Sequence, residues 1–186
     1  LHLVSGERFG VYEILHRIGS GGMGSVYAAF NHQLKRRVAL KVIQKDSAVS
    51  STQNLLQEAQ SIAQLEHPHI VTVYNVGEEG GLFYIEMQLI LGQPLNHVLR
   101  DQDLPTERII RLLTELASAL DHAHERGVIH RDIKAENVLV SDDGSARLVD
   151  FGLSQIDQES LKKMRAFNGL DSDDSEQPIA DPSKYS

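Results

Sequence analysis

The strongest signal in the chain begins with His130-Arg131-Asp132-Ile133-Lys134-Ala135-Glu136-Asn137 and ends with Asp150-Phe151-Gly152. Charged and amide side chains crowd its first part, and Asp150 follows 13 residues after Asn137. Between the two parts, short apolar runs at 138–140 and 147–149 predict two pieces of strand. No other pattern in the chain is as specific.

Upstream of this stretch, Val38-Ala39-Leu40-Lys41 predicts a strand that carries a lysine among apolar residues. The period of two puts Ala39 and Lys41 on one face of it. In the predicted helix of residues 52–65, Glu58 lies on the inward apolar face with Leu55 and Ile62, so we expect it to meet Lys41. A buried unpaired charge would cost roughly 3–5 kcal/mol. The alternative is two exposed charges whose stems cover apolar surface.

Gly19-Ser20-Gly21-Gly22-Met23-Gly24 matches the pattern G-x-G-x-x-G. A helix follows the glycines of a dinucleotide-binding unit, but the run from Ser25 to Phe30 predicts a strand, and no Lys-Ser or Lys-Thr follows. A glycine-rich turn between antiparallel strands can lay backbone N–H groups over the phosphates of a nucleotide. Taken alone, the pattern equally fits a flexible hairpin.

Two regions of different secondary structure follow one another along the chain. A sheet of about five antiparallel strands is predicted at 12–15, 26–29, 38–43, 70–74 and 83–87, separated by turns such as Gly77–Gly81. After residue 92 the pattern is helical: Thr106-Glu107 resembles an N-terminal cap, and the apolar positions from Ile109 to Ala123 predict a helix buried on nearly all sides. From Ser154 onward the chain is polar, which predicts a mobile tail.

Composition narrows the class of protein. The chain has 186 residues, no cysteine and a formal charge of −8. The missing cysteines exclude a disulfide framework and fit a reducing compartment, and the acidic balance argues against nucleic acid as a partner. No apolar run is long enough to span a membrane.

In this order and at these intervals, the glycines, Lys41, Glu58, His130-Arg131-Asp132 with Asn137, and Asp150-Phe151-Gly152 resemble the protein kinases. Residues 19–27 and His67-Pro68-His69-Ile70-Val71 are most similar to the bacterial serine/threonine kinases of the eukaryotic-like type. The resemblance covers about residues 8–153. It implies an α+β, two-lobed fold with a complete N-lobe, made of the five-stranded antiparallel sheet and one helix, and a truncated, mainly helical C-lobe.

The resemblance also implies roles for individual residues. Lys41 would hold the α- and β-phosphates of ATP and be held by Glu58, while Asp132 would orient the substrate hydroxyl and accept its proton. Lys134 would steady the γ-phosphate, and a lysine there is typical of kinases that act on serine or threonine. Asn137 and Asp150 would bind Mg²⁺, which prefers oxygen ligands.

The residues expected to bind the rest of ATP belong to the glycine-rich loop, an apolar slot for adenine, and the hinge that joins the lobes. They are Ile18, Gly19, Gly21, Gly24, Val26, Ala39, Met87, Gln88, Ile90 and Leu139, with Gln88 and Ile90 acting through their backbone. His130 and Phe151 are expected to pack and align the site.

The resemblance divides the chain into an N-lobe over 1–87, a hinge and first part of the C-lobe over 88–153, and a partial activation segment over 154–186. Kinase domains continue beyond this point, so we expect a fragment with little or no activity of its own and a tendency to self-associate.

The resulting function is transfer of the γ-phosphoryl group of ATP to protein Ser/Thr hydroxyls in the cytoplasm, in a chain that could be the cytosolic part of a membrane-anchored protein. The alternative is a pseudokinase or scaffold that binds nucleotide and acts by contact, although no key residue is missing. A nucleotide oxidoreductase would rest on the glycines alone. The histidine pairs 67/69 and 122/124 lack the spacing of a metal site.

Overall fold

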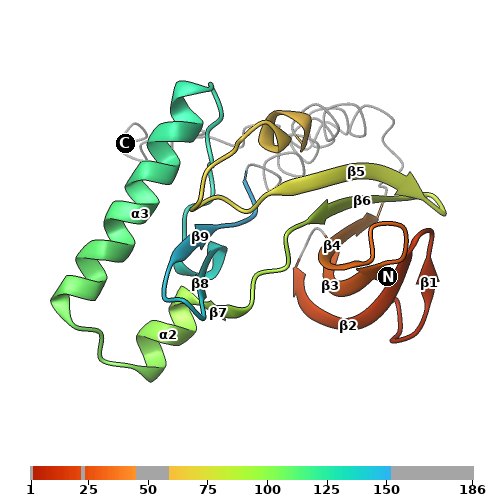
Figure 1. The fold of residues 1–186 in the computed structure, drawn as a ribbon, viewed down its shortest axis with the longest axis horizontal. Helices are drawn as coiled ribbons and strands as arrows, with labels where there is room; N and C mark the ends of the chain where they lie inside the picture. Colours follow the sequence, from red (N-terminus) through yellow and green to blue (C-terminus); the bar gives the residue numbers. More distant parts are fainter. Residues whose placement is uncertain (1, 22–23, 45–58, 152–186) are drawn as a thin grey trace, which may run out of the picture.

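A computed structural model describes residues 2–21, 24–44 and 59–151. A sheet of six strands forms one end of the molecule, and two helices with a small three-stranded sheet form the other (Figure 1). This two-part α+β arrangement confirms the predicted fold class.

All neighbours in the large sheet are antiparallel. In sheet order its strands are β1 (Arg8–Phe9), β2 (Tyr12–Gly21), β3 (Gly24–Asn31), β4 (Arg36–Gln44), β6 (Leu82–Met87) and β5 (Val73–Glu79). The edge strand β1 was not among the five predicted strands. It is only two residues long, which is too short to show an alternating pattern.

Alternation in β4 separates two cores, as the sequence predicted. Val38, Leu40 and Val42 are fully buried and pack with Tyr12 and Tyr27 on the outer face of the sheet. Ala39 lies on the opposite face, in a second core that extends into the helical part of the molecule. Lys41 lies on the same inner face as Ala39, so its amine points toward the junction of the two parts.

The predicted strand at 70–74 is wrong in its bounds. Strand β5 runs from Val73 to Glu79, and the turn that follows it is confined to Gly80-Gly81. Ile70 instead pairs with Leu148, in parallel orientation. The apolar, β-branched run at 70–73 predicts a strand, but the local pattern does not reveal which distant segment it joins.

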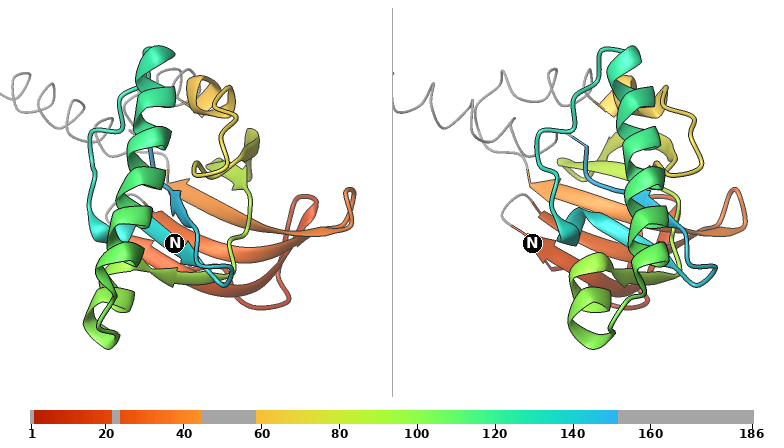
Figure 2. Two further views of the ribbon diagram at one scale, coloured as in Figure 1. Left: turned by 60° about the vertical axis from the view of Figure 1, so that its left-hand side comes forward. Right: turned by 90° about the vertical axis from the view of Figure 1, so that its left-hand side faces the viewer.

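The second part contains two α-helices and a short 3₁₀ helix, with the small sheet beside them (Figure 2). Its elements are β7 (Gly92–Pro94), α2 (Leu95–Asp101), α3 (Thr106–Glu125), η1 (Ala135–Asn137), β8 (Val138–Ser141) and β9 (Ala146–Leu148). Strand β8 lies between β7 and β9, both antiparallel to it. The two strand pieces predicted around Asn137 and Asp150 are confirmed as β8 and β9.

Helix α3 differs from its prediction in two respects. Pro105 precedes its first turn as the N-cap residue, and no side chain caps that turn. Only Leu112, Ala119 and Ala123 are buried, so the expectation of burial on nearly all sides is wrong for the structure described. The apolar positions surround the helix, whereas the described elements pack against one side of it.

Of the predicted helix at 52–65, residues 59–63 are helical, with Ala59 and Ile62 in the inner core. The rest of that prediction, Glu58 included, lies outside the described residues, as do the glycine-rich positions 22–23 and the segment 152–186.

Candidate active site

An ion pair joins the two parts of the molecule. Lys41 Nζ, on β4, donates a hydrogen bond to Asp150 Oδ1 at 2.8 Å, across 109 residues of sequence. The side chain of Lys41 is 8% exposed and that of Asp150 is 34% exposed. The pair therefore links the inner face of the large sheet to the segment that leaves β9.

Asp132, Lys134 and Asn137 converge within the loop that precedes β8. Lys134 Nζ donates to Asp132 Oδ2 at 2.7 Å, and Asn137 Nδ2 donates to the same oxygen at 2.9 Å and to the Asp132 carbonyl at 2.8 Å. The Lys134 bond is the main cause that lowers the pKa of Asp132, and the same bond raises the pKa of Lys134. Both groups are therefore charged near neutral pH.

Two residues of this region have a strained backbone. Arg131 and Asp150 adopt φ angles of 64° and 60°, in the left-handed region that residues with a Cβ seldom enter. Each such conformation costs on the order of 1–3 kcal/mol, and the surrounding contacts must hold it.

His130 and Phe151 pack as the sequence predicted. His130 is fully buried, its ring centroid lies 4.5 Å from that of Phe151, and Nε2 donates to the Val149 carbonyl at 3.0 Å. Burial lowers the pKa of His130. A neutral, buried ring thus braces the loop of Asp132 against the segment of Asp150.

The apolar residues expected around adenine lie near Lys41 on the large sheet. Val26 pairs with Lys41, and Ala39 pairs with Met87, so the three strands β3, β4 and β6 bring them to one face. Val26, Ala39, Met87 and Ile90 belong to the inner core. Ile18 is 48% exposed.

Leu139 lies on the small sheet, half-buried between the buried residues Val138 and Val140 of β8, and alternation turns it to the opposite face from them. The backbone N–H of Gln88 donates to the Thr72 carbonyl at 2.9 Å. This bond fixes the start of the segment that joins the two parts of the molecule.

The glycine-rich hairpin joins β2 and β3. Gly19 and Gly21 lie on β2, where an added Cβ would meet nothing within 4 Å. Gly24 is different: its φ is +149°, and a Cβ there would overlap the Val42 carbonyl oxygen. Two of the three glycines therefore keep open space beside the strand, and the third permits close approach of β3 to β4.

One polar cluster was missed by the sequence analysis. Glu86 on β6 is buried and accepts hydrogen bonds from the Tyr12 hydroxyl and from Asn31 Nδ2, each at 3.0 Å. Arg36 Nη2 lies 3.5 Å from the carboxylate, and its guanidinium carbon is 3.7 Å from the ring centroid of Tyr74. The signal was present, since a carboxylate in the apolar run Phe83–Met87 requires a donor just as Lys41 requires an anion.

Comparison with known proteins agrees with this geometry. The family model of the protein kinase domain matches residues 12–170 of the sequence. The chain therefore belongs to the protein kinase family.

Several curated relatives are bacterial serine/threonine-protein kinases. The chain is 41% identical over 154 residues to PknD of Mycobacterium tuberculosis, with 81% of this chain and 23% of PknD covered. It is 36% identical over 156 residues to PrkC of Bacillus subtilis, with 82% of this chain and 24% of PrkC covered. The chain thus spans about a quarter of the length of these relatives.

Among solved structures, the PknI kinase domain of Mycobacterium tuberculosis matches with a TM-score of 0.72 and 32% identity, over 82% of this chain and 64% of that one. This match supports the kinase-like fold independently of the motifs. Within the described ranges, no helix combines the length and apolar character that crossing a bilayer requires.

Proposed function

We propose that this chain is the N-terminal part of a protein kinase domain that transfers the γ-phosphoryl group of ATP to serine or threonine hydroxyls of proteins. The observation that carries the proposal is the assembly, around the Lys41–Asp150 pair, of the carboxylate, amine and amide groups that phosphoryl transfer needs. Such transfer relies on positioning and on charge neutralisation more than on covalent chemistry.

We assign the phosphates of ATP to Lys41 and to the backbone of Gly19, Gly21 and Gly24. Lys41 is largely desolvated, so its charge acts on an anion with little screening. Glu58, which lies outside the described residues, keeps its proposed role as the partner that holds this amine. Adenine would contact Ile18, Val26, Ala39, Met87 and Leu139, with hydrogen bonds from the backbone at Gln88 and Ile90.

Mg²⁺ would be held by Asn137 and Asp150. Both amide-nitrogen bonds of Asn137 go to Asp132, so the amide oxygen is the atom it can offer a cation, and Asp150 supplies a carboxylate. When bound, the ion would neutralise charge on the transferring phosphoryl group.

Asp132 would orient the acceptor hydroxyl and take its proton. Its Oδ2 accepts from Lys134 and Asn137, so we assign Oδ1 to the hydroxyl. The hydroxyl oxygen forms a bond to the γ-phosphorus, the bond from that phosphorus to the β–γ bridging oxygen breaks, and ADP leaves. Because the pKa of Asp132 is lowered, we expect proton transfer late in the reaction, after the new bond has largely formed.

The division into an N-lobe over 1–87, a hinge and C-lobe start over 88–153, and an activation segment from 154 stays part of the proposal. So does a cytoplasmic site of action, since the reaction consumes ATP. Protein Ser/Thr substrates are the partners it requires.

Nucleotide binding can be tested by thermal unfolding with ATP and Mg²⁺. Ligand at 100 times its dissociation constant stabilises a protein by about 2.7 kcal/mol. At roughly 2–4 °C per kcal/mol this predicts a rise of roughly 5–10 °C in Tm. Lys41→Met and Asp150→Asn should abolish the rise, and His16→Gln, on the exposed part of β2, should retain it. An unchanged shift in both site variants would contradict the assignment.

Phosphoryl transfer itself is tested separately, with the chain and with a version extended through the rest of a kinase domain. We expect little transfer to a generic Ser/Thr protein by the 186-residue chain, and transfer abolished by Asp132→Asn in the extended form. Binding without transfer in the extended form would favour the scaffold alternative.

A further inference from the structure

On the edge of β9 that faces away from β8, the backbone N–H and C=O groups find their hydrogen-bond partners outside the small sheet. Ser141 N–H donates to the Ser145 carbonyl at 2.9 Å in the β8–β9 hairpin, so the peptide groups of Ala146 and Leu148 face away from β8. At Leu148 they are satisfied by backbone: Leu148 N–H donates to the His69 carbonyl at 2.8 Å, and Val71 N–H donates to the Leu148 carbonyl at 2.9 Å. Residues 69–71 therefore act as a parallel strand beside β9.

This backbone ladder cannot continue to Ala146. A further repeat would need the His69 N–H and the His67 carbonyl, but His69 N–H donates to His67 Nδ1 at 3.2 Å and the His67 carbonyl accepts from Ile70 N–H at 3.1 Å. The chain turns here, around Pro68. Ala146 is fully buried, so both of its outward peptide groups need other partners.

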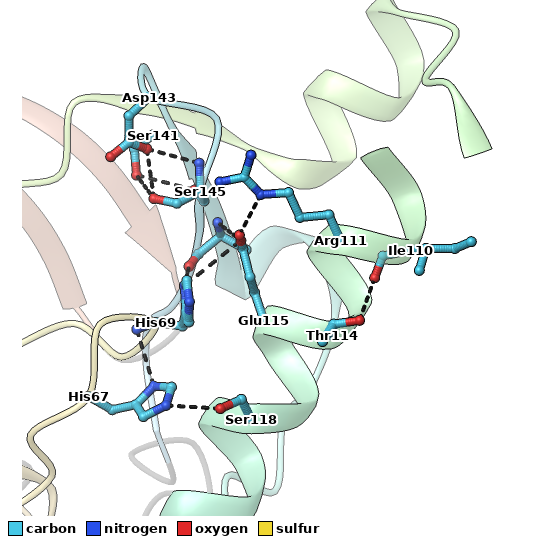
Figure 3. A network of polar contacts seen from close by, with 11 residues as sticks. His67, His69, Ile110, Arg111, Thr114, Glu115, Ser118, Ser141, Asp143 and Ser145 are labelled. Carbon is cyan, nitrogen blue, oxygen red and sulfur yellow. Dashed lines mark hydrogen bonds and ion pairs between the residues drawn. The ribbon is translucent and has the colours of Figure 1, made fainter. Parts of the chain in front are cut away.

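Two side chains supply them (Figure 3). His69 Nδ1 donates to the Ala146 carbonyl at 2.9 Å, and Glu115 Oε2, from α3, accepts from Ala146 N–H at 2.8 Å. His69 Nδ1 lies 3.8 Å from the same carboxylate oxygen. The two side chains thus hold one peptide unit from two different elements.

Glu115 is a charged acceptor despite being only 11% exposed. Burial alone would raise its pKa, but the bonds from Ala146 N–H and Arg111 more than offset this, and the pKa is lowered. Arg111 Nε donates to Oε1 at 2.9 Å, one turn earlier on α3. A carboxylate acceptor makes a stronger hydrogen bond than a neutral one.

Strand β9, which His69 and Glu115 hold at Ala146, lies next to the proposed metal ligands Asn137 and Asp150 in the sequence and in hydrogen bonding. Leu148 ends β9, Asp150 follows two residues later, and Val149 N–H donates to the Asn137 carbonyl at 3.0 Å. We propose that His69 and Glu115 are positioning residues, which clamp β9 at Ala146 and so set where Asp150 and Asn137 stand relative to each other. This inference rests on the function proposed above.

The test compares ADP affinity in Mg²⁺ with ADP affinity in EDTA, by calorimetry on the full chain. His69→Leu and Glu115→Leu should lower the ADP affinity about tenfold in Mg²⁺ and change it little in EDTA. Tenfold is the lower end of what residues that support metal ligands contribute to metal affinity. His69→Asn and Glu115→Gln, which keep a donor and an acceptor, should restore most of the loss. Ser118→Ala is the matched control, since Ser118 lies on α3 but meets His67 rather than β9.

Wild-type affinity in the leucine variants, or an equal loss in Mg²⁺ and EDTA, would overturn the positioning role. Wild-type protein that does not bind ADP in either buffer would overturn the proposed function instead.

If the leucine variants do not fold, amide hydrogen exchange of Glu115→Gln decides the matter. The neutral acceptor should reduce protection at Ala146 several-fold and leave Leu148 unchanged, since the latter is held by backbone. Unchanged protection at Ala146 would overturn the clamp.

Discussion

Gly24 combines a φ of +149° with a position where any Cβ would overlap the Val42 carbonyl oxygen. The neighbouring atom is backbone in the middle of β4, so it cannot move aside as a flexible side chain could. The closeness of β3 and β4 therefore requires glycine at position 24. At Gly19 and Gly21, by contrast, an added Cβ would meet no neighbouring atom within 4 Å. Glycines within one motif thus serve different physical purposes.

Gly24→Ala should lower the free energy of unfolding by roughly 1–3 kcal/mol, the usual cost of a strained backbone. Gly19→Ala should change it by less than about 0.5 kcal/mol, as expected for a substitution away from such features. Urea unfolding of both variants measures the difference. Equal effects would show that the closeness of β3 to β4 does not require glycine.

Glu86 depends on its donors because its carboxylate is almost wholly removed from water. Burial, together with the bond to Glu86, raises the pKa of Tyr12, which keeps the hydroxyl protonated as a donor. Tyr12→Phe should therefore destabilise the fold by about 1–3 kcal/mol, the cost of a buried polar group left unsatisfied. Tyr84→Phe is the comparison, because its hydroxyl interacts with Asn75 at 3.5 Å and with the Tyr12 side chain, whereas the Tyr12 hydroxyl bonds to Glu86 directly. Chemical unfolding that ranks the two variants equally would contradict this account.

At the scale of elements, a hydrogen bond from the neutral side chain of His67 connects the loop before β5 to helix α3. His67 Nδ1 accepts from His69 N–H, so Nε2 carries the proton and donates to Ser118 Oγ at 3.1 Å. The ring centroid of His122 lies 5.0 Å away. A second proton on His67 would remove the bond at Nδ1 and add repulsion between the rings.

Burial, followed by the charges of His122 and His69, lowers the pKa of His67 from its ordinary value of 6.5. The unfolded chain therefore takes up this proton at higher pH than the folded chain does, and the stability that His67 contributes is present above pH 6.5 and lost as pH falls through the lowered pKa. We expect the free energy of unfolding to fall between about pH 7 and pH 5, where most carboxylates stay charged. His67→Gln should flatten part of this slope, and His16→Gln should not. The expectation fails if the slope is the same in all three proteins.

At the scale of the whole molecule, α3 carries apolar side chains that the described elements leave exposed. Ile109, Ile110 and Leu113 are 40%, 58% and 61% exposed. Exposed apolar groups that adjoin one another favour association, and the net charge of −8 opposes it only weakly at ordinary salt.

We expect the 186-residue chain to self-associate at micromolar concentrations, as measured by sedimentation velocity. Ile110→Lys should shift the distribution toward monomer. Glu107→Gln, at an exposed position of the same helix, changes the charge by the same amount and should leave the distribution unaltered. A monomeric wild-type chain would contradict the prediction.

Local sequence patterns were enough to predict which residues share a face of one element and which motifs occur together. The alternation of Val38, Leu40 and Val42 against Ala39 and Lys41 was readable because the period of a strand is local. The two-lobed fold and the convergence of Asp132, Lys134 and Asn137 were implied by the resemblance to the protein kinases.

Which distant element each face contacts depends on packing in three dimensions, and local patterns do not encode it. The sequence did not show that Ile70 pairs with Leu148, that Glu86 gathers donors from three strands, or that His69 and Glu115 close the edge of β9. These contacts join segments tens of residues apart, and the partner of a buried polar group is set by long-range packing that leaves no periodic trace in either segment. The strained backbone at Arg131 and Asp150 has the same origin, because only the assembled surroundings hold it in place.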